Sequence, residues 1–158
     1  MMDFCEIINN KENTEMIFRI LTLIIMILTS VYDIRDKKIP VSIPAELSIL
    51  SIIHELYLWS INAFDIKEML LSFMPGVILI AVCMISQQSV GLGDGLIVFA
   101  IGPVFGMLDL VLMIFIALVL SGIIGGILLV LKKVNGRSTL PFIPFLSTGM
   151  GVMCFAFL

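Results

Sequence analysis

The 158-residue chain has little charge and few cysteines. Charged residues make up 13% of it, whereas a soluble domain carries about 25%. The net charge of -3 leaves no basic surface for nucleic acid, which excludes that class of partner. Cys5, Cys83 and Cys154 are odd in number and far apart, so they give neither a disulfide framework nor a paired-cysteine metal site. We expect them to behave as small apolar residues.

Long apolar runs fill most of the sequence, and 60% of the residues are hydrophobic. A membrane crossing takes about 20 residues in a helix, so the chain has room for about six. We therefore predict an all-α fold, a polytopic membrane helix bundle with about six transmembrane helices. The expected spans are residues 16–32, 41–59 and 68–86, two spans within 95–131, and 140–158.

The predicted spans form a single integral-membrane domain, residues 1–158, with a short polar segment at 1–15. This segment lacks the basic stretch of a cleavable signal peptide, so the first helix is expected to stay. Pro75 and Gly76 predict a kink in the third span. The stretch GPVFGMLD at 102–109 predicts the turn between the fourth and fifth spans.

Basic residues predict the orientation of this bundle. The connections after spans one, three and five hold six Lys and Arg residues, and the opposite side holds three. Cytoplasmic loops of membrane proteins carry the excess of basic residues. We therefore expect both termini outside the cell and the loops with more basic residues in the cytoplasm. The six basic residues of these loops are Arg35, Lys37, Lys38, Lys132, Lys133 and Arg137.

Two carboxylates are expected to meet at the cytoplasmic face. Asp33 closes the first span and Asp94 opens the fourth, and two crossings separate them. Both side chains therefore fall on the same side of the membrane if the second and third spans both cross. Two carboxylates a few Å apart do not both ionise easily, so such a pair holds one proton. That is the arrangement with which aspartic proteases activate water against a peptide bond.

Glycines surround the second carboxylate, in the stretch GLGDG. Gly91, Gly93 and Gly95 have no Cβ, so the backbone can turn sharply and let an extended substrate strand approach Asp94. The simpler interpretation is that Asp94 is a helix N-cap after a glycine loop. The simpler interpretation of Asp33 is a solvated charge at the membrane border. Asp36, three residues later, is the other candidate for the role given to Asp33. Glu46, His54 and Glu55 are read as polar contacts inside the bundle, with no catalytic role.

Three motifs in order resemble the type IV prepilin peptidase family, membrane aspartic proteases of the GxGD class. They are YDIRDKKIP at 32–40, GLGDGL at 91–96 and PFIPFL at 141–146. The resemblance implies that Asp33 and Asp94 are the catalytic pair, with Gly91, Gly93, Gly95 and Pro40 assigned to substrate binding. It implies no metal and no organic cofactor. Val41 and Leu96 depart from the family pattern, which often has Asn and Lys there.

The resemblance also implies a substrate and a location. Family members remove the short basic leader of prepilins, pseudopilins or archaellin-type proteins, for pilus assembly or protein secretion, at the cytoplasmic side of the prokaryotic inner membrane. The chain resembles a short form without the cysteine-containing segment associated with methyl transfer. Three alternatives stay open: a presenilin-like or signal-peptide-peptidase-like protease, a proton-coupled transporter that uses both carboxylates, and a non-catalytic subunit.

Overall fold

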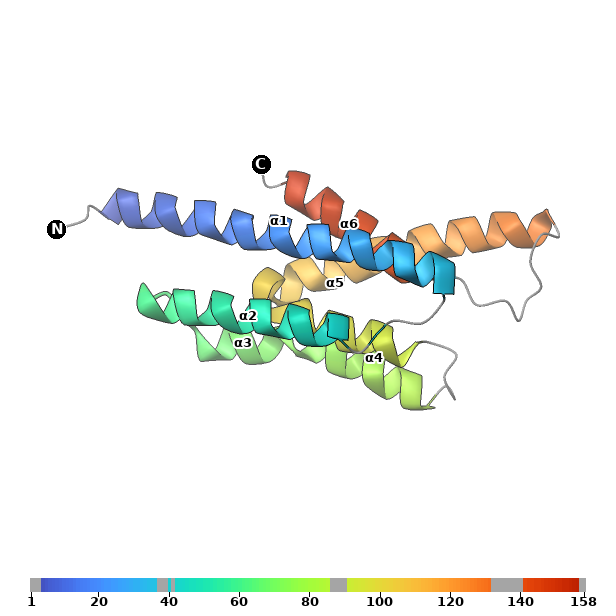
Figure 1. Cartoon of the computed structure of the whole chain (residues 1–158), viewed down its shortest axis with the longest axis horizontal. Coiled ribbons are helices and arrows are strands. Elements are labelled where there is room, and N and C mark those ends of the chain that lie inside the picture. Colours follow the sequence, from blue (N-terminus) through green and yellow to red (C-terminus); the bar gives the residue numbers. More distant parts are fainter. Residues whose placement is uncertain (1–3, 37–39, 41, 86–90, 132–140, 157–158) are drawn as a thin grey trace.

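A computed structural model describes residues 4–36, 40, 42–85, 91–131 and 141–156 of the chain. All regular secondary structure in these residues is helical, which confirms the all-α prediction. The helices lie side by side in an elongated bundle (Figure 1). They are α1 (Phe4–Asp36), α2 (Ser42–Ser60), α3 (Ile66–Ser72), α4 (Met74–Ile85), α5 (Leu92–Val130) and α6 (Ile143–Ala156).

The predicted kink in the third span divides it into α3 and α4. The helix is interrupted at Phe73, two residues before Pro75. Proline has no N–H to continue the helical hydrogen bonds and its ring clashes with the preceding turn, so the chain starts a new helix there. Gly76 lies against the backbone of Phe99 in α5, where a side chain would not fit.

The predicted turn within 102–109 also forms, inside α5. Gly106 has φ 76° and ψ 169°, a conformation open mainly to glycine, and the chain doubles back at this residue (Figure 1). The two arms of α5, residues 92–105 and 107–130, therefore run in opposite directions. Asp94 and Gly106 consequently lie at opposite ends of the bundle, and we call these ends the aspartate end and the Gly106 end.

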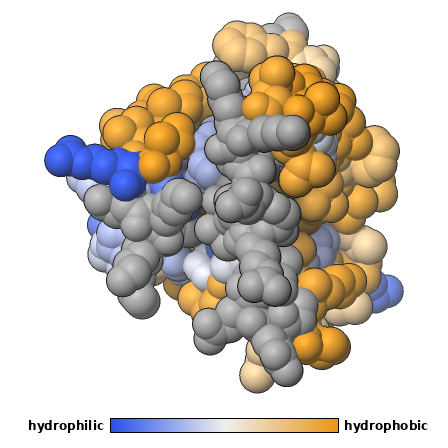
Figure 2. Space-filling model, turned by 90° about the vertical axis from the view of Figure 1, so that its right-hand side faces the viewer, coloured by the Kyte–Doolittle hydropathy of each residue, from blue (hydrophilic) through white to orange (hydrophobic). Residues whose placement is uncertain are grey.

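Three segments among the described residues are long and apolar enough to cross a membrane. They are Lys11–Arg35, Ile66–Ile85 and Leu92–Val130, and α6 is a shorter apolar helix. The outer faces of these helices carry exposed Ile, Leu, Val and Phe side chains, as expected of surfaces that face lipid. Seen from the aspartate end, hydrophobic residues form much of the rim of the molecule (Figure 2).

The first arm of α5 forms the centre of the bundle. Ile97, Val98 and Ile101 are fully buried, and this arm packs against α2, α3 and α4. Ser51 of α2 donates a hydrogen bond to the Ala100 carbonyl across one of these contacts. The second arm packs against α6, where Gly149 lies against the backbone of Met113. The central arm thus holds Asp94 in a fixed place at its beginning.

Candidate active site

Asp33 lies in the last full turn of α1 and points into the bundle, where its residue is only 6% exposed. Its Oδ2 accepts a hydrogen bond from the backbone N–H of Ile143 at 3.1 Å. The two residues are 110 positions apart in the sequence, so this bond joins α1 to the beginning of α6. The polar partner compensates part of the cost of burying a carboxylate.

The Ile143 amide is available because α6 begins at this residue. The first N–H groups of a helix have no partner within the helix, and its N-terminus carries a partial positive charge. Asp33 supplies the missing acceptor from another helix. One turn deeper, the Ser30 and Ser147 hydroxyl oxygens lie 3.0 Å apart, in a second hydrogen bond between α1 and α6. The first bond orients the Asp33 carboxylate, and the second holds α1 against α6 beside it.

Asp94 lies in the first turn of α5, and its residue is 8% exposed. Gly91 is the N-cap of this helix, with an extended backbone and no side chain to cap it. The Asp94 N–H donates to the Gly91 carbonyl at 3.1 Å, and the Gly91 N–H donates to the Asp94 carboxylate. The carboxylate thus reaches back to the N-cap residue, as the third residue of a helix does in a capping box.

The two carboxylates lie near each other at the aspartate end. Asp33 and Asp94 are close enough for the charge of one to act on the other. The Asp33 carboxylate, on α1, faces the N-terminus of α6, and Asp94 lies in the first turn of α5, and both of these helix N-termini favour negative charge. The fold therefore offsets part of the repulsion between two buried acids. Such a pair can accept a proton from water at one carboxylate and donate a hydrogen bond from the other.

The residues predicted to bind substrate differ in exposure. Gly91 and Pro40 are exposed, and Gly93 is half-buried. A Cβ added at Gly91 would lie 2.9 Å from Oδ2 of Asp94, so the absence of a side chain keeps that carboxylate in place. Gly95 is buried, and a Cβ there would lie 2.8 Å from the Ile80 side chain, so it lets α5 pack closely on α4.

Glu46, the other acid considered for a supporting role, does not share the burial of the pair. Glu46 is exposed on the first turns of α2, and the side chain of Asp36 lies outside the described part of the structure. Leu96 is half-buried in α5, whereas Val41 and five of the six basic loop residues are outside the described residues. Within the described residues, no group of three His, Cys, Asp or Glu side chains could hold a metal ion.

The Ile143 amide and the Ser30–Ser147 contact are site features that the sequence reading missed. A backbone N–H has no sequence signature of its own. The only signal was the position of Ile143 inside the PFIPFL motif, where two prolines mark the start of a helix. The motif thereby gains a structural role, because it begins α6 and presents the Ile143 amide to Asp33.

Comparison with known proteins gives one match. The model of the type IV leader peptidase family matches residues 20–130 of this chain. That range includes both aspartates and the GLGDGL motif, and it ends with the second arm of α5. No curated protein and no solved structure matches the chain.

Proposed function

Because the chain belongs to the type IV leader peptidase family, we propose that it is a membrane aspartic endopeptidase that removes the short basic leader of a pilin-like precursor. The proposal rests mainly on the burial of Asp33 and Asp94 at one end of the bundle, each against a helix N-terminus. Two acids of this kind at the edge of a membrane domain have the chemistry of an aspartic protease. The family match favours this function over a presenilin-like protease, a transporter or a non-catalytic subunit.

The proposed reaction uses one ionised and one protonated carboxyl group. The ionised carboxylate takes a proton from a water molecule as its oxygen attacks the scissile carbonyl carbon, and the protonated carboxyl hydrogen-bonds the carbonyl oxygen. The tetrahedral intermediate then breaks the C–N bond, and the leaving nitrogen takes up a proton from the pair. The products are the free leader carboxylate and the new N-terminal amine. The shared proton belongs to the pair rather than to either residue.

Substrate binding is proposed along the glycine loop. The scissile bond must be extended, because a peptide bond inside a helix is already hydrogen-bonded and shielded from water. Gly91 and Gly93 lie beside Asp94 and leave space for an extended strand, and Pro40 is exposed at the same end. Gly95 is buried against Ile80, so its proposed part is to hold α5 close to α4 beneath this strand.

The bundle is proposed to cross the membrane six times. The two arms of α5 supply two crossings and α3 with α4 supplies one. α1 supplies a further crossing, and α2 and α6 lie alongside it (Figure 1). Arg35 is exposed at the aspartate end, as the basic loops of a cytoplasmic face require. The site then faces the cytoplasm of the prokaryotic inner membrane, where a basic leader precedes the hydrophobic helix of a prepilin, pseudopilin or archaellin-type substrate.

Cleavage by the purified full-length protein tests this function. The protein, in liposomes, is incubated with a pilin-type precursor, and the products are identified by mass spectrometry. We expect a single cut just before the hydrophobic segment, unchanged by a metal chelator. A precursor whose residue before the cut is replaced serves as the matched control. An intact precursor, or activity that needs a metal ion, would contradict the proposed reaction.

A further inference from the structure

A polar cavity lies at the Gly106 end of the bundle, far from the two aspartates. Its volume is about 200 Å³, and side chains from α1, α2, α3 and α5 line it. The proposed peptidase reaction uses none of them. The titratable residues of the lining are Lys11, Glu15, Arg19, His54, Glu55, Asp65 and Glu68.

His54 is the residue of this cavity whose surroundings indicate a ligand. Its side chain is only 3% exposed, and neither ring nitrogen has a hydrogen-bond partner within the described structure. The nearest acidic atom is Oε1 of Glu55, 3.8 Å from Nδ1, which is too far for a hydrogen bond. A buried polar group without a partner costs about 1 to 3 kcal/mol. A polar group that enters the cavity would remove this cost.

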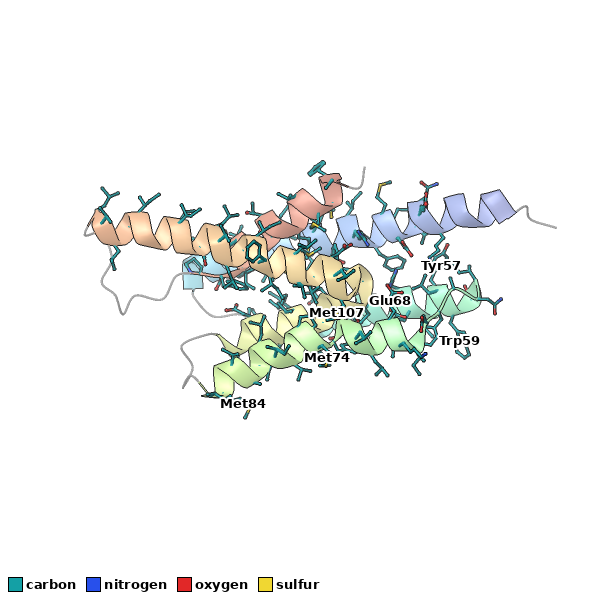
Figure 3. The ribbon with its side chains drawn as sticks, turned by 180° about the vertical axis from the view of Figure 1, so that it is seen from behind. Tyr57, Trp59, Glu68, Met74, Met84 and Met107 are labelled. Carbon is teal, nitrogen blue, oxygen red and sulfur yellow. The ribbon has the colours of Figure 1, made fainter. Side chains whose placement is uncertain are left out.

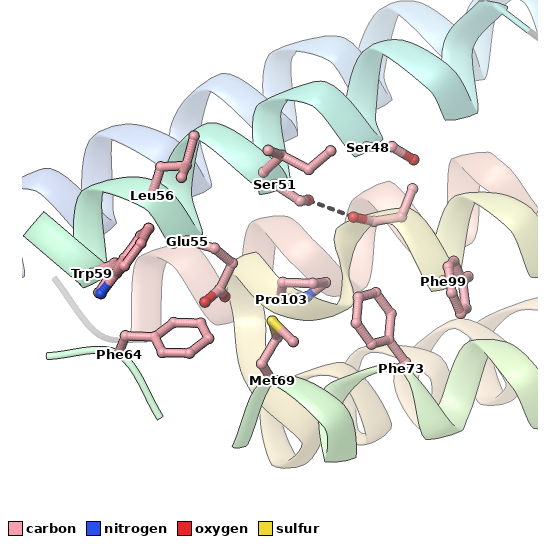
Figure 4. Close-up of a pocket in the computed structure, with 12 residues that line it drawn as sticks. Ser48, Ser51, Glu55, Leu56, Trp59, Phe64, Met69, Phe73, Phe99 and Pro103 are labelled. Atoms are coloured by element: carbon pink, nitrogen blue, oxygen red, sulfur yellow. Dashed lines mark hydrogen bonds between the residues drawn. The ribbon is translucent and has the colours of Figure 1, made fainter. Parts of the chain in front are cut away.

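An apolar groove adjoins the polar cavity. It has a volume of about 530 Å³ and lies between α2, α3 and the first arm of α5 (Figure 4). Aromatic side chains line it at several points: Trp59, Phe64, Phe73 and Phe99. Glu55, Met69 and Pro103 line both the groove and the polar cavity, so the two spaces are neighbours. The combined site is apolar along most of its length and charged at one end.

The dimensions of the groove fit a hydrocarbon chain. It follows α2 from Ser48 to Trp59, about 16 Å at about 1.5 Å per residue. The other apolar occupant of this length is a transmembrane helix, which is about 10 to 12 Å across with its side chains, and the experiment below distinguishes the two.

The depth of the site also fits a lipid. Trp59 and Tyr57 lie near the end of α2, and aromatic residues of this kind mark the level of the lipid headgroups (Figure 3). Glu68 of α3 lies beside the turn of α5, near Met107, in the same view. The polar cavity is thus at the membrane boundary, and the groove runs from it toward the bilayer centre.

We propose that the groove and the polar cavity together bind one zwitterionic phospholipid whose headgroup carries a primary amine. One acyl chain fills the groove, and the headgroup enters the cavity, where its amine faces Glu55 and Glu68. His54 gains a polar partner from the same headgroup. This site is separate from the aspartate pair and takes no part in peptide cleavage.

The charges that line the cavity favour a headgroup with an amine. The cavity lining has four carboxylates and two cations, and both cations already pair with acids. Lys11 lies 3.5 Å from Glu15, and Arg19 lies 3.0 Å from Asp109. A headgroup with only negative charge would meet the excess of carboxylates, whereas an ammonium group would offset it. The phosphate of the same lipid remains within the field of Arg19.

Native mass spectrometry of the full-length protein tests the site with two probes of equal acyl chains, phosphatidylethanolamine and phosphatidylglycerol. We expect several-fold greater retention of phosphatidylethanolamine. Ile52→Trp, in the groove, should lower that retention at least fivefold, whereas Ile53→Trp, which is equally apolar and exposed on the same helix but lies outside the groove, should not. Glu55→Gln should abolish the preference between the probes, and Glu46→Gln on the same helix should keep it.

Three results of the lipid-binding measurement would overturn the proposal. They are equal retention of phosphatidylethanolamine by the two tryptophan variants, equal or greater retention of phosphatidylglycerol by the parent protein, and an unchanged preference in Glu55→Gln. If Ile52→Trp instead raised only the KM for precursor cleavage, the groove would hold the substrate's helix, which also contradicts a lipid site. A variant such as Ile52→Trp that loses lipid binding but still cleaves the precursor shows that the lipid site and the proposed peptidase function can be tested separately.

Discussion

Oδ2 of Asp33 accepts the backbone N–H of Ile143 at 3.1 Å, across 110 residues of sequence. This bond positions one acid of the pair through the start of α6. We predict that Ile143→Pro, which removes the N–H, lowers the rate of precursor cleavage about tenfold or more, because a hydrogen bond to a charged group contributes about 1.5 to 3 kcal/mol. Initial rates at saturating precursor measure the effect.

The control for this substitution is Ile143→Ala. The Ile143 side chain is fully buried, so both variants lose packing, but only proline loses the donor. We expect Ile143→Ala to keep a rate well above that of Ile143→Pro at equal membrane levels. Equal rates for the two variants would show that the amide does not serve Asp33.

Gly91 leaves space for the other acid of the pair. A Cβ at this position would lie 2.9 Å from Oδ2 of Asp94, while the backbone of Gly91, with φ -65° and ψ 128°, suits any residue. Gly91→Ala should therefore move the carboxylate, lowering kcat several-fold with little loss of thermal stability. Gly122→Ala is the matched control, since a Cβ there meets no described atom within 4 Å. A several-fold loss in the control as well would refute this explanation.

Gly102 holds α3 against the first arm of α5. A Cβ at Gly102 would collide with the carbonyl oxygen of Ser72, and backbone atoms cannot move aside as a flexible side chain can. Overpacking of this kind costs about 1 to 3 kcal/mol, so Gly102→Ala should lower the Tm in detergent by several degrees. Gly151→Ala, at a glycine with open space around it, should leave the Tm unchanged. An unchanged Tm for Gly102→Ala would contradict the close helix contact.

Local sequence signals predicted much of the fold. Apolar runs predicted the helices, Pro75 and Gly76 predicted the break near the start of α4, and the stretch GPVFGMLD predicted the turn within α5, which the structure places at Gly106. The sequence also predicted that Asp33 and Asp94 lie at one end, because that depends only on the number of crossings between them. α1 begins earlier than the predicted first span, at Phe4, since polar residues can continue a helix beyond the membrane.

Contacts between distant segments could not be predicted in the same way. The Ile143 amide and the groove beside Trp59 depend on how helices far apart in sequence meet, and no local pattern encodes that. His54 was expected to make polar contacts inside the bundle, but within the described residues both its nitrogens lack a hydrogen bond. A pattern of apolar residues predicts which side of a helix is buried. It does not predict which polar partner a side chain such as His54 will meet there.

The most direct test of the central claim compares Asp33→Asn and Asp94→Asn with Glu46→Gln, an exposed acid on α2. Each variant is co-expressed with a pilin-type precursor, and loss of the leader is followed by gel shift at matched membrane levels. Asparagine keeps the shape of aspartate but cannot take a proton from water. The account predicts no cleavage by either asparagine variant and normal cleavage by Glu46→Gln. Cleavage that survives either asparagine substitution would contradict the two-carboxylate site.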